Sequence, residues 1–189
     1  MSKTTVSKTQ VMVEGALMVA LAVILSQFVY SGSWLQGGSI SFEMVPIVVM
    51  GYRHGNRWGV FTGFVFGFLN MVLGFSNVLY CPTLITQIGC ILLDYLVAFS
   101  VLGLSGMFAD LFGRNAASYA CSAVIVSALR FVCHYISGIW LWGGWAPEGT
   151  PAWLYSLTYN GTYMAVDAVL TAATVVLLYK GARSLLEKQ

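Results

Sequence analysis

The segment Arg130–Asn160, RFVCHYISGIWLWGGWAPEGTPAWLYSLTYN, decides the fold of this chain. Its first part is predicted to be the outer half of a membrane helix. Residues spaced four apart share one face of a helix, and four of them here are Arg130, His134, Gly138 and Trp142. A loop with Gly and Pro follows, and the next helix contributes Tyr155 and Asn160. Polar and aromatic groups on two neighbouring helices at one level indicate a site for a small, flat, polar molecule.

The composition of the whole chain places this segment in a membrane. The chain has 189 residues, of which 58% are hydrophobic and 8% charged, whereas soluble domains carry about 25% charged residues. A membrane span needs about 20 mostly apolar residues, so six spans nearly exhaust the chain. We therefore expect an all-α integral membrane protein with a single six-helix domain over residues 1–189. The four cysteines form no C-x-x-C pair, and no metal site is expected.

Six apolar stretches are predicted to be transmembrane helices. The second is short and contains Pro46, and the third has Gly59, Gly63 and Gly67 at four-residue intervals, which predicts close helix packing. The predicted ranges are 11–30, 40–52, 60–75, 84–108, 116–141 and 152–179.

The positions of the basic residues predict the orientation of these helices. If the N-terminus lies inside the cell, the outer loops contain no Lys or Arg. The inner segments then hold eight of the nine basic residues, leaving only Arg130 inside a span. Cytoplasmic segments are enriched in Lys and Arg, so both termini are predicted to be cytoplasmic. The eight residues are Lys3, Lys8, Arg53, Arg57, Arg114, Lys180, Arg183 and Lys188.

Ionisable groups inside spans are candidates for function because they are costly to bury. At about 1.5 Å per residue, Asp94 and Arg130 lie at similar depths of roughly 15–16 Å, with His134 somewhat nearer the outside. An alternative is a buried Asp94–Arg130 ion pair that only holds two helices together. Asp167 is expected roughly 22 Å down, deeper than the site, and Glu14 near the inner rim.

Motifs for catalysis or ATP hydrolysis are missing from the sequence. There is no G-x-x-x-x-G-K-[ST] phosphate loop, no H-E-x-x-H zinc motif and no G-x-S-x-G nucleophile motif. A channel is disfavoured because the outer rim is aromatic and has no ring of charges. The chain is therefore expected to be a binding subunit, not an enzyme, with no cofactor.

Several blocks of the sequence resemble one family of membrane proteins. They are ISFEMVPI, LLDYLVAFSVLGLSGMF, LRFVCHYISGIWLW and WLYSLTYNG. At these blocks, and over nearly its whole length, the chain resembles the thiamine-specific S-component of energy-coupling-factor (ECF) vitamin transporters. The resemblance implies a multi-pass protein of the prokaryotic cell membrane that captures thiamine from outside. It also implies a transmembrane coupling subunit and two cytosolic ATPases as partners, and no nucleic acid.

The resemblance also assigns roles to residues. It implies that Asp94 binds the aminopyrimidine and that Trp142 stacks on the ligand, while Ala16 and Ala20 form the face for the coupling subunit. Two positions depart from the family, because Asp94 replaces its usual Glu and Arg130 an expected Lys. Together, the residue pattern and the resemblance give nine expected binding residues: Trp34, Asp94, Tyr95, Arg130, His134, Gly138, Trp142, Tyr155 and Asn160.

Two other functions remain open from the sequence. The chain could be an S-component for another vitamin, such as riboflavin or a pyridine derivative. It could also be a small intramembrane enzyme that uses Asp94 and His134 as acid and base.

Overall fold

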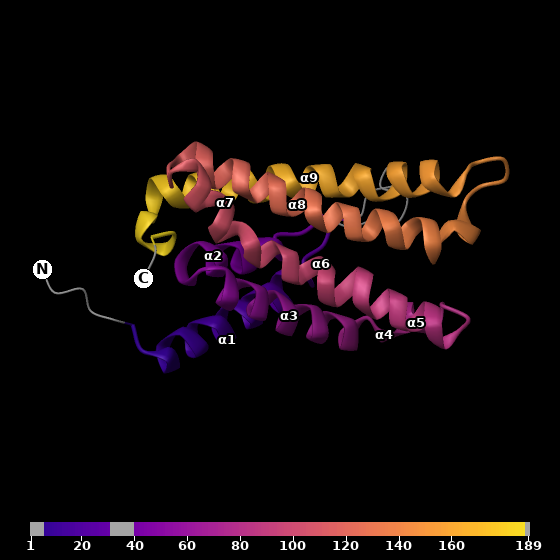
Figure 1. The fold of residues 1–189 in the computed structure, drawn as a ribbon, viewed down its shortest axis with the longest axis horizontal. Helices are drawn as coiled ribbons and strands as arrows, with labels where there is room; N and C mark the ends of the chain where they lie inside the picture. The colour runs from indigo at the N-terminus through magenta and orange to yellow at the C-terminus, as the bar shows by residue number, and fades with distance from the viewer. Residues whose placement is uncertain (1–5, 31–39, 188–189) are drawn as a thin grey trace, which may run out of the picture.

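The computed structural model describes residues 6–30 and 40–187, and within these ranges the chain is almost entirely helical (Figure 1). The only extended pairing in the described part is an isolated antiparallel bridge between Tyr30 and Ile40. The helices run α1 (Lys8–Leu25), α2 (Met44–His54), α3 (Asn56–Leu73), α4 (Phe75–Leu79), α5 (Leu84–Cys90), α6 (Val97–Ser100), α7 (Ser105–Phe112), α8 (Ala116–Trp140) and α9 (Ala152–Gly181).

The long helices lie roughly along the longest axis of the molecule. In Figure 1, α8 and α9 lie side by side above α1, α3 and α5. The start of α1 and the end of α9 lie at the same end of this bundle. We call that end the inner end, and the end with the α8–α9 loop the outer end.

Local capping sets where the long helices begin. The Ser7 side chain accepts a hydrogen bond from the Gln10 amide, and the Gln10 side chain accepts one from the Ser7 amide. This capping box satisfies two free amides, so α1 begins three residues before the predicted residue 11. Asn115 caps α8 in a similar way through the Ser118 amide.

The predicted fourth span is a continuous but irregular helical segment from Leu84 to Phe112. Between α5 and α6 it contains a π-helical turn at Ile91–Leu96, and between α6 and α7 a 3₁₀ turn at Val101–Leu104. Both Asp94 and Tyr95 lie in the π-helical turn. π-helical turns inside α-helices are frequent at functional sites.

Four helical segments of the described chain are long and apolar enough to cross a membrane: α1, Leu84–Phe112, α8 and α9. By contrast, α2 has 11 residues and spans only about 16 Å. The 18 residues of α3 correspond to about 27 Å. Length and composition thus support an all-helical membrane protein, while the six-span arrangement stays a prediction.

The glycines of α3 form a close contact with the irregular fourth segment. A methyl group added at Gly63 would lie 2.2 Å from the Phe99 carbonyl oxygen, and one at Gly67 would lie 2.6 Å from that of Tyr95. Gly59 makes the equivalent approach to Gly103. This is the close packing that the four-residue glycine spacing predicts, and it holds the π-helical turn against α3.

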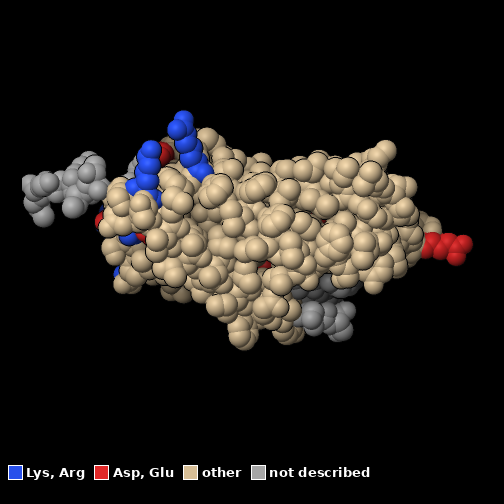
Figure 2. Space-filling model, turned by 90° about the horizontal axis from the view of Figure 1, so that it is seen from below, with Lys and Arg blue, Asp and Glu red and all other residues tan. Residues whose placement is uncertain are grey.

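Charged side chains gather at the inner end. On the face shown in Figure 2, Lys and Arg are visible only there. Glu14 of α1 forms ion pairs with Arg53 and His54 at the end of α2. The His54 side chain is only 2% exposed and hydrogen-bonds Glu14 of α1.

Candidate ligand-binding site

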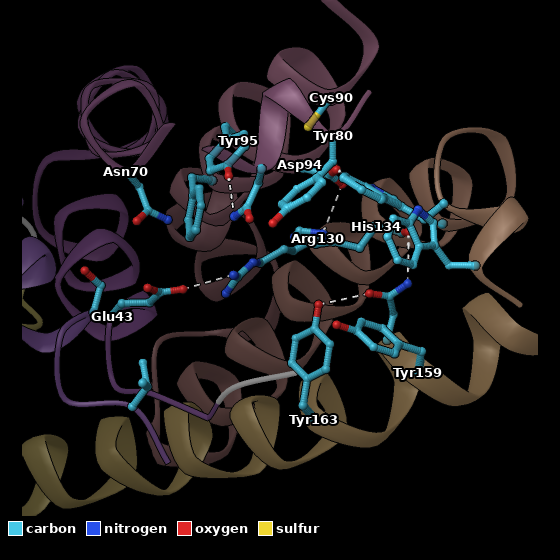
Figure 3. Close-up of a pocket in the computed structure, with 18 of the residues that line it drawn as sticks. Glu43, Asn70, Tyr80, Cys90, Asp94, Tyr95, Arg130, His134, Tyr159 and Tyr163 are labelled. Carbon is cyan, nitrogen blue, oxygen red and sulfur yellow. Dashed lines mark hydrogen bonds and ion pairs between the residues drawn. The ribbon is translucent and has the colours of Figure 1, made fainter. Parts of the chain in front are cut away.

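A cavity of about 690 Å³ lies between α3, α4, the α5–α6 part of the irregular segment, α8 and α9 (Figure 3). Eight of the nine residues expected from the sequence line it. The ninth, Trp34, lies outside the described residues. The eight are Asp94, Tyr95, Arg130, His134, Gly138, Trp142, Tyr155 and Asn160.

The Asp94 carboxylate holds together the outer part of the cavity. Its Oδ1 lies 3.3 Å from Nδ1 of His134, and its Oδ2 accepts a hydrogen bond of 3.0 Å from Nε1 of Trp142. The Asp94 and His134 side chains are 14% and 13% exposed. A carboxylate shielded from water forms stronger interactions than one at a surface, so these contacts fix the imidazole and the indole at the cavity wall.

His134 has one ring nitrogen available to a ligand. Its Nδ1 faces Asp94, whereas Nε2 is buried and has no hydrogen-bond partner among the described residues. A neutral imidazole with one nitrogen occupied can donate or accept at the other. Because unpaired buried polar groups are costly, Nε2 is a candidate hydrogen-bonding atom for a polar molecule in the cavity.

The sequence left open an ion pair between Asp94 and Arg130, and this pairing is wrong. Arg130 instead donates from Nη2 to Oε1 of Glu43 at 3.0 Å, and its guanidinium lies 4.3 Å from the centre of the Phe99 ring. In Figure 3, the His134 side chain of α8 points toward Asp94, whereas the Arg130 side chain points toward Glu43. Arg130 Nε and Nη1 are buried without a partner in the described chain.

Glu43 is a lining residue that the sequence analysis missed. It is 8% exposed and precedes the first residue of α2. Its sequence signal was an acidic residue at the entrance of a short apolar stretch, within the block ISFEMVPI. The block was recognised, but Glu43 is not among the five ionisable groups that the sequence analysis places inside spans.

A row of tyrosines on α9 forms another wall that sequence reasoning recognised only in part. Tyr155, Tyr159 and Tyr163 are spaced four apart, with ring centres 5.6 Å and 6.1 Å from one to the next. All three line the cavity. Their spacing on one helix face could have revealed Tyr159 and Tyr163 alongside the expected Tyr155.

Asn160 joins α9 to α8 through a network of hydrogen bonds. Its Nδ2 donates to the His134 carbonyl oxygen at 3.1 Å and to Ser156 Oγ at 3.2 Å, while its Oδ1 accepts from the Tyr163 hydroxyl at 3.0 Å. Both amide hydrogens are therefore used within the protein. One lone pair of Oδ1 remains for a ligand.

Gly138 and Tyr95 are the last two of the expected residues that line the cavity, and their surroundings differ from each other. A methyl group at Gly138 would lie 2.2 Å from Ser156 Oγ, so glycine here permits the close approach of α8 and α9. The Tyr95 hydroxyl accepts from Asn77 Nδ2 at 3.2 Å and donates to the Gly74 carbonyl oxygen at 3.3 Å. These bonds orient the ring of Tyr95, which packs beside the cavity.

The charge of the lining favours a cationic ligand. The Lys, Arg, Asp and Glu residues among the described lining are Glu43, Asp94 and Arg130. With these ionised and His134 neutral, the lining carries a net charge of −1. Its aromatic side chains can bind a cation through their ring faces, and its volume lies in the usual range for small-molecule sites.

The fold and the cavity define a class: a helical, strongly apolar protein with a cavity of small-molecule size lined by charged and aromatic side chains. Residues 12–187 match the family described as "Thiamine transporter protein", and this chain belongs to that family.

Individual relatives agree with this assignment. The chain is 39% identical to the thiamine transporter ThiT of Bacillus subtilis (strain 168), with 93% of each sequence covered. It is 29% identical to ThiT of Lacticaseibacillus paracasei, over 89% of this chain and 86% of that protein. The solved structure of ThiT from Listeria monocytogenes is similar with a TM-score of 0.78 and 25% identity, covering 94% of this chain and 97% of that one.

Proposed function

We propose that this chain is the thiamine-binding S-component of an ECF-type importer. It captures thiamine from the extracellular side and delivers it through a coupling subunit and two cytosolic ATPases. The observation that carries the proposal is the cavity lined by Asp94, His134 and Trp142, whose Lys, Arg, Asp and Glu side chains in the described lining are two carboxylates and one guanidinium, in a chain of the thiamine transporter family. Thiamine carries a permanent positive charge and fits this balance.

The chemistry of the lining suits both rings of thiamine. The thiazolium cation binds to aromatic faces such as that of Trp142. The aminopyrimidine offers an amine donor to Asp94 and ring nitrogens to donors on the wall. His134 Nε2, which has no partner among the described residues, supplies one such contact, and Tyr155 and Asn160 face the remaining edge.

A six-span topology with both termini in the cytoplasm agrees with the distribution of charge. The basic residues of the described chain outside the cavity lie near the inner end, and the α8–α9 loop carries Glu148 and no Lys or Arg. Cytoplasmic segments are enriched in Lys and Arg. In this orientation the Asp94 end of the cavity lies nearer the outside of the cell.

The first helix is the proposed contact for the coupling subunit. Ala16 and Ala20 are exposed on α1, and small residues four apart let another helix approach closely. Of the four candidate spans, α1 has the smallest share of residues buried within the bundle, 17%. Its neighbours Met12 and Leu17 are 59% and 66% exposed, which leaves an apolar face for lipid or a partner helix.

The decisive experiment identifies the bound molecule directly. The protein is purified in detergent from cells grown with thiamine, denatured, and the released ligand is analysed by mass spectrometry. We expect unmodified thiamine. Titration of ligand-free protein with thiamine, riboflavin and pyridoxine, followed by tryptophan fluorescence, then measures specificity. Release of a different vitamin, or of a chemically altered product, would contradict the proposal.

A further inference from the structure

Asp167 is a buried carboxylate that the proposed binding chemistry does not use. It lies in the middle of α9, is 2% exposed and is not among the residues that line the cavity. Charged groups within a span are rare and usually have a function. The carboxylate has one hydrogen-bonding partner in the described chain, since Oδ1 accepts from the Ser41 backbone amide at 3.0 Å.

This bond anchors residues 40–43 where the chain re-enters the bundle. The side chain of Ile40 is 8% exposed and clusters with Tyr163 and Met164 of α9. Ser41 is 4% exposed. Its amide is in an irregular segment, so it has no helical partner and needs an acceptor from elsewhere. Asp167 provides that acceptor.

The anchored segment leads directly to the cavity. The Ser41 hydroxyl accepts from the Glu43 amide at 3.4 Å, and the Glu43 carboxylate pairs with Arg130 at 3.0 Å. Each of these three residues is less than one-tenth exposed. A connected set of buried contacts therefore joins Asp167 to the guanidinium at the inner part of the cavity.

We propose that Asp167 is a positioning residue for the ligand site. By accepting the Ser41 amide, it holds Glu43 against Arg130 and so sets the charge and shape that the ligand meets at that end. The inference rests on the proposed thiamine binding for its ligand. The property of Asp167 that matters is its acceptor oxygen, because this oxygen bonds the Ser41 amide and Asp167 does not line the cavity.

A ligand-free measurement tests the anchor itself. Asp167→Asn keeps an acceptor at the same position, whereas Asp167→Leu and Asp167→Ala remove it. Thr171→Val is the matched control, since Thr171 is fully buried one turn further along α9 and its hydroxyl has no partner in the described chain. We expect hydrogen exchange at the Ser41 amide to accelerate in the Leu and Ala variants only. Unchanged exchange in them would overturn the proposal.

Thiamine affinity tests the link to Glu43 through a double-mutant cycle. Asp167→Leu should weaken binding by about tenfold, as expected for loss of a charge-assisted hydrogen bond, while Asp167→Asn and Thr171→Val stay within about threefold. In a Glu43→Gln background, the additional loss from Asp167→Leu should shrink to about threefold or less. If the losses of affinity from Asp167→Leu and Glu43→Gln multiply fully in the double variant, Asp167 has only a general structural role and the proposal is overturned. A loss in Thr171→Val equal to that in Asp167→Leu would have the same consequence.

Ser41→Pro removes the same hydrogen bond from the donor side, because proline has no amide hydrogen. It changes a residue outside α9, so it serves even if substitutions at Asp167 prevent folding. We expect the same loss of affinity, and wild-type affinity in this variant would contradict the proposal. If the wild-type protein does not bind thiamine, the proposed function fails, while the exchange measurement still decides whether Asp167 is the anchor.

Discussion

The indole of Trp142 donates a hydrogen bond of 3.0 Å to the Asp94 carboxylate. Trp142 lies two residues beyond the end of α8, where its carbonyl oxygen accepts a hydrogen bond of 3.0 Å from the Trp145 amide. The carboxylate of another helix orients its ring at the outer part of the cavity. One acidic residue thus positions an aromatic wall and also remains available to a ligand.

Removing the charge of Asp94 should weaken thiamine binding while keeping the shape of the site. Asp94→Asn replaces one acceptor with a donor, which disturbs the contacts to Trp142, His134 and the ligand amine. Loss of a charge-assisted hydrogen bond in a shielded site costs about 1.5–3 kcal/mol. The dissociation constant should therefore rise roughly 10- to 150-fold, as measured by fluorescence titration. Glu148→Gln, an exposed position in the α8–α9 loop that does not line the cavity, is the control and should change affinity by no more than about threefold.

Truncating Trp142 should also lower affinity strongly. Trp142→Ala removes stacking area and the attraction between the ring face and a cation, so we expect a loss of at least about tenfold. Trp142→Phe should recover part of it, because a ring remains. Trp153→Ala provides the comparison, since Trp153 is 51% exposed and does not line the cavity. Equal affinities of the Trp142→Ala variant and the wild type would show that the binding site lies elsewhere.

Gly138 should not tolerate a larger side chain. The methyl group of Gly138→Ala would lie 2.2 Å from Ser156 Oγ and 2.9 Å from Asn160 Nδ2, which pushes α8 and α9 apart. Overpacking of this kind costs about 1–3 kcal/mol. Thermal unfolding in detergent should show a lower midpoint, accompanied by weaker thiamine binding. Gly144→Ala has open space around the added methyl group, and a similar destabilisation there would refute the steric explanation.

Bulky residues on the exposed face of α1 should separate binding from transport. With Ala16 and Ala20 both replaced by Trp, close approach of a partner helix is blocked, whereas neither residue lines the cavity. Co-purification with the coupling subunit should be lost, and thiamine affinity should stay within about threefold. Leu177→Trp, at a position that is 67% exposed on α9, should leave the complex intact. Normal complex formation in the Ala16/Ala20 variant would rule out this face as the interface.

The protein should bind thiamine alone but not accumulate it alone. It has no phosphate-loop motif with which to use ATP. Proteoliposomes that contain only this chain should therefore show no ATP-dependent uptake of radiolabelled thiamine, and addition of the coupling subunit and the ATPases should restore it. ATP-driven uptake by the chain alone would disprove the subunit assignment.

The positions of the long helices could be predicted closely from hydropathy. The expected helix at residues 116–141 is observed as Ala116–Trp140, and that at 152–179 as Ala152–Gly181. Such stretches are predominantly apolar, with few ionisable residues, and end in clear loops. Three expected residues of α8, Arg130, His134 and Gly138, line one cavity because a regular helix keeps residues four apart on one face.

The pairing of charges could not be predicted in the same way. Depth along a helix suggested Asp94 as a neighbour of Arg130, but depth does not specify the direction in which a side chain points. Glu43 pairs with Arg130 instead, because residues 40–43 fold back against α9. This is a tertiary contact between residues that are 126 positions apart in the sequence. No periodic pattern in the sequence reports such a contact.

The wide turn at Ile91–Leu96 has a consequence for the register of its helix. A π-helical turn accommodates one more residue than an α-helical turn, and each residue of an α-helix rotates the chain by about 100°. The side chains in the outer half of this segment are therefore rotated about the helix axis by about one residue relative to those in the inner half, which packs on the α3 glycines. Deleting a single residue here would restore a regular helix and swing Leu84–Cys90 about a quarter of a turn. The chain can vary the side chains in this turn more readily than it can vary its length.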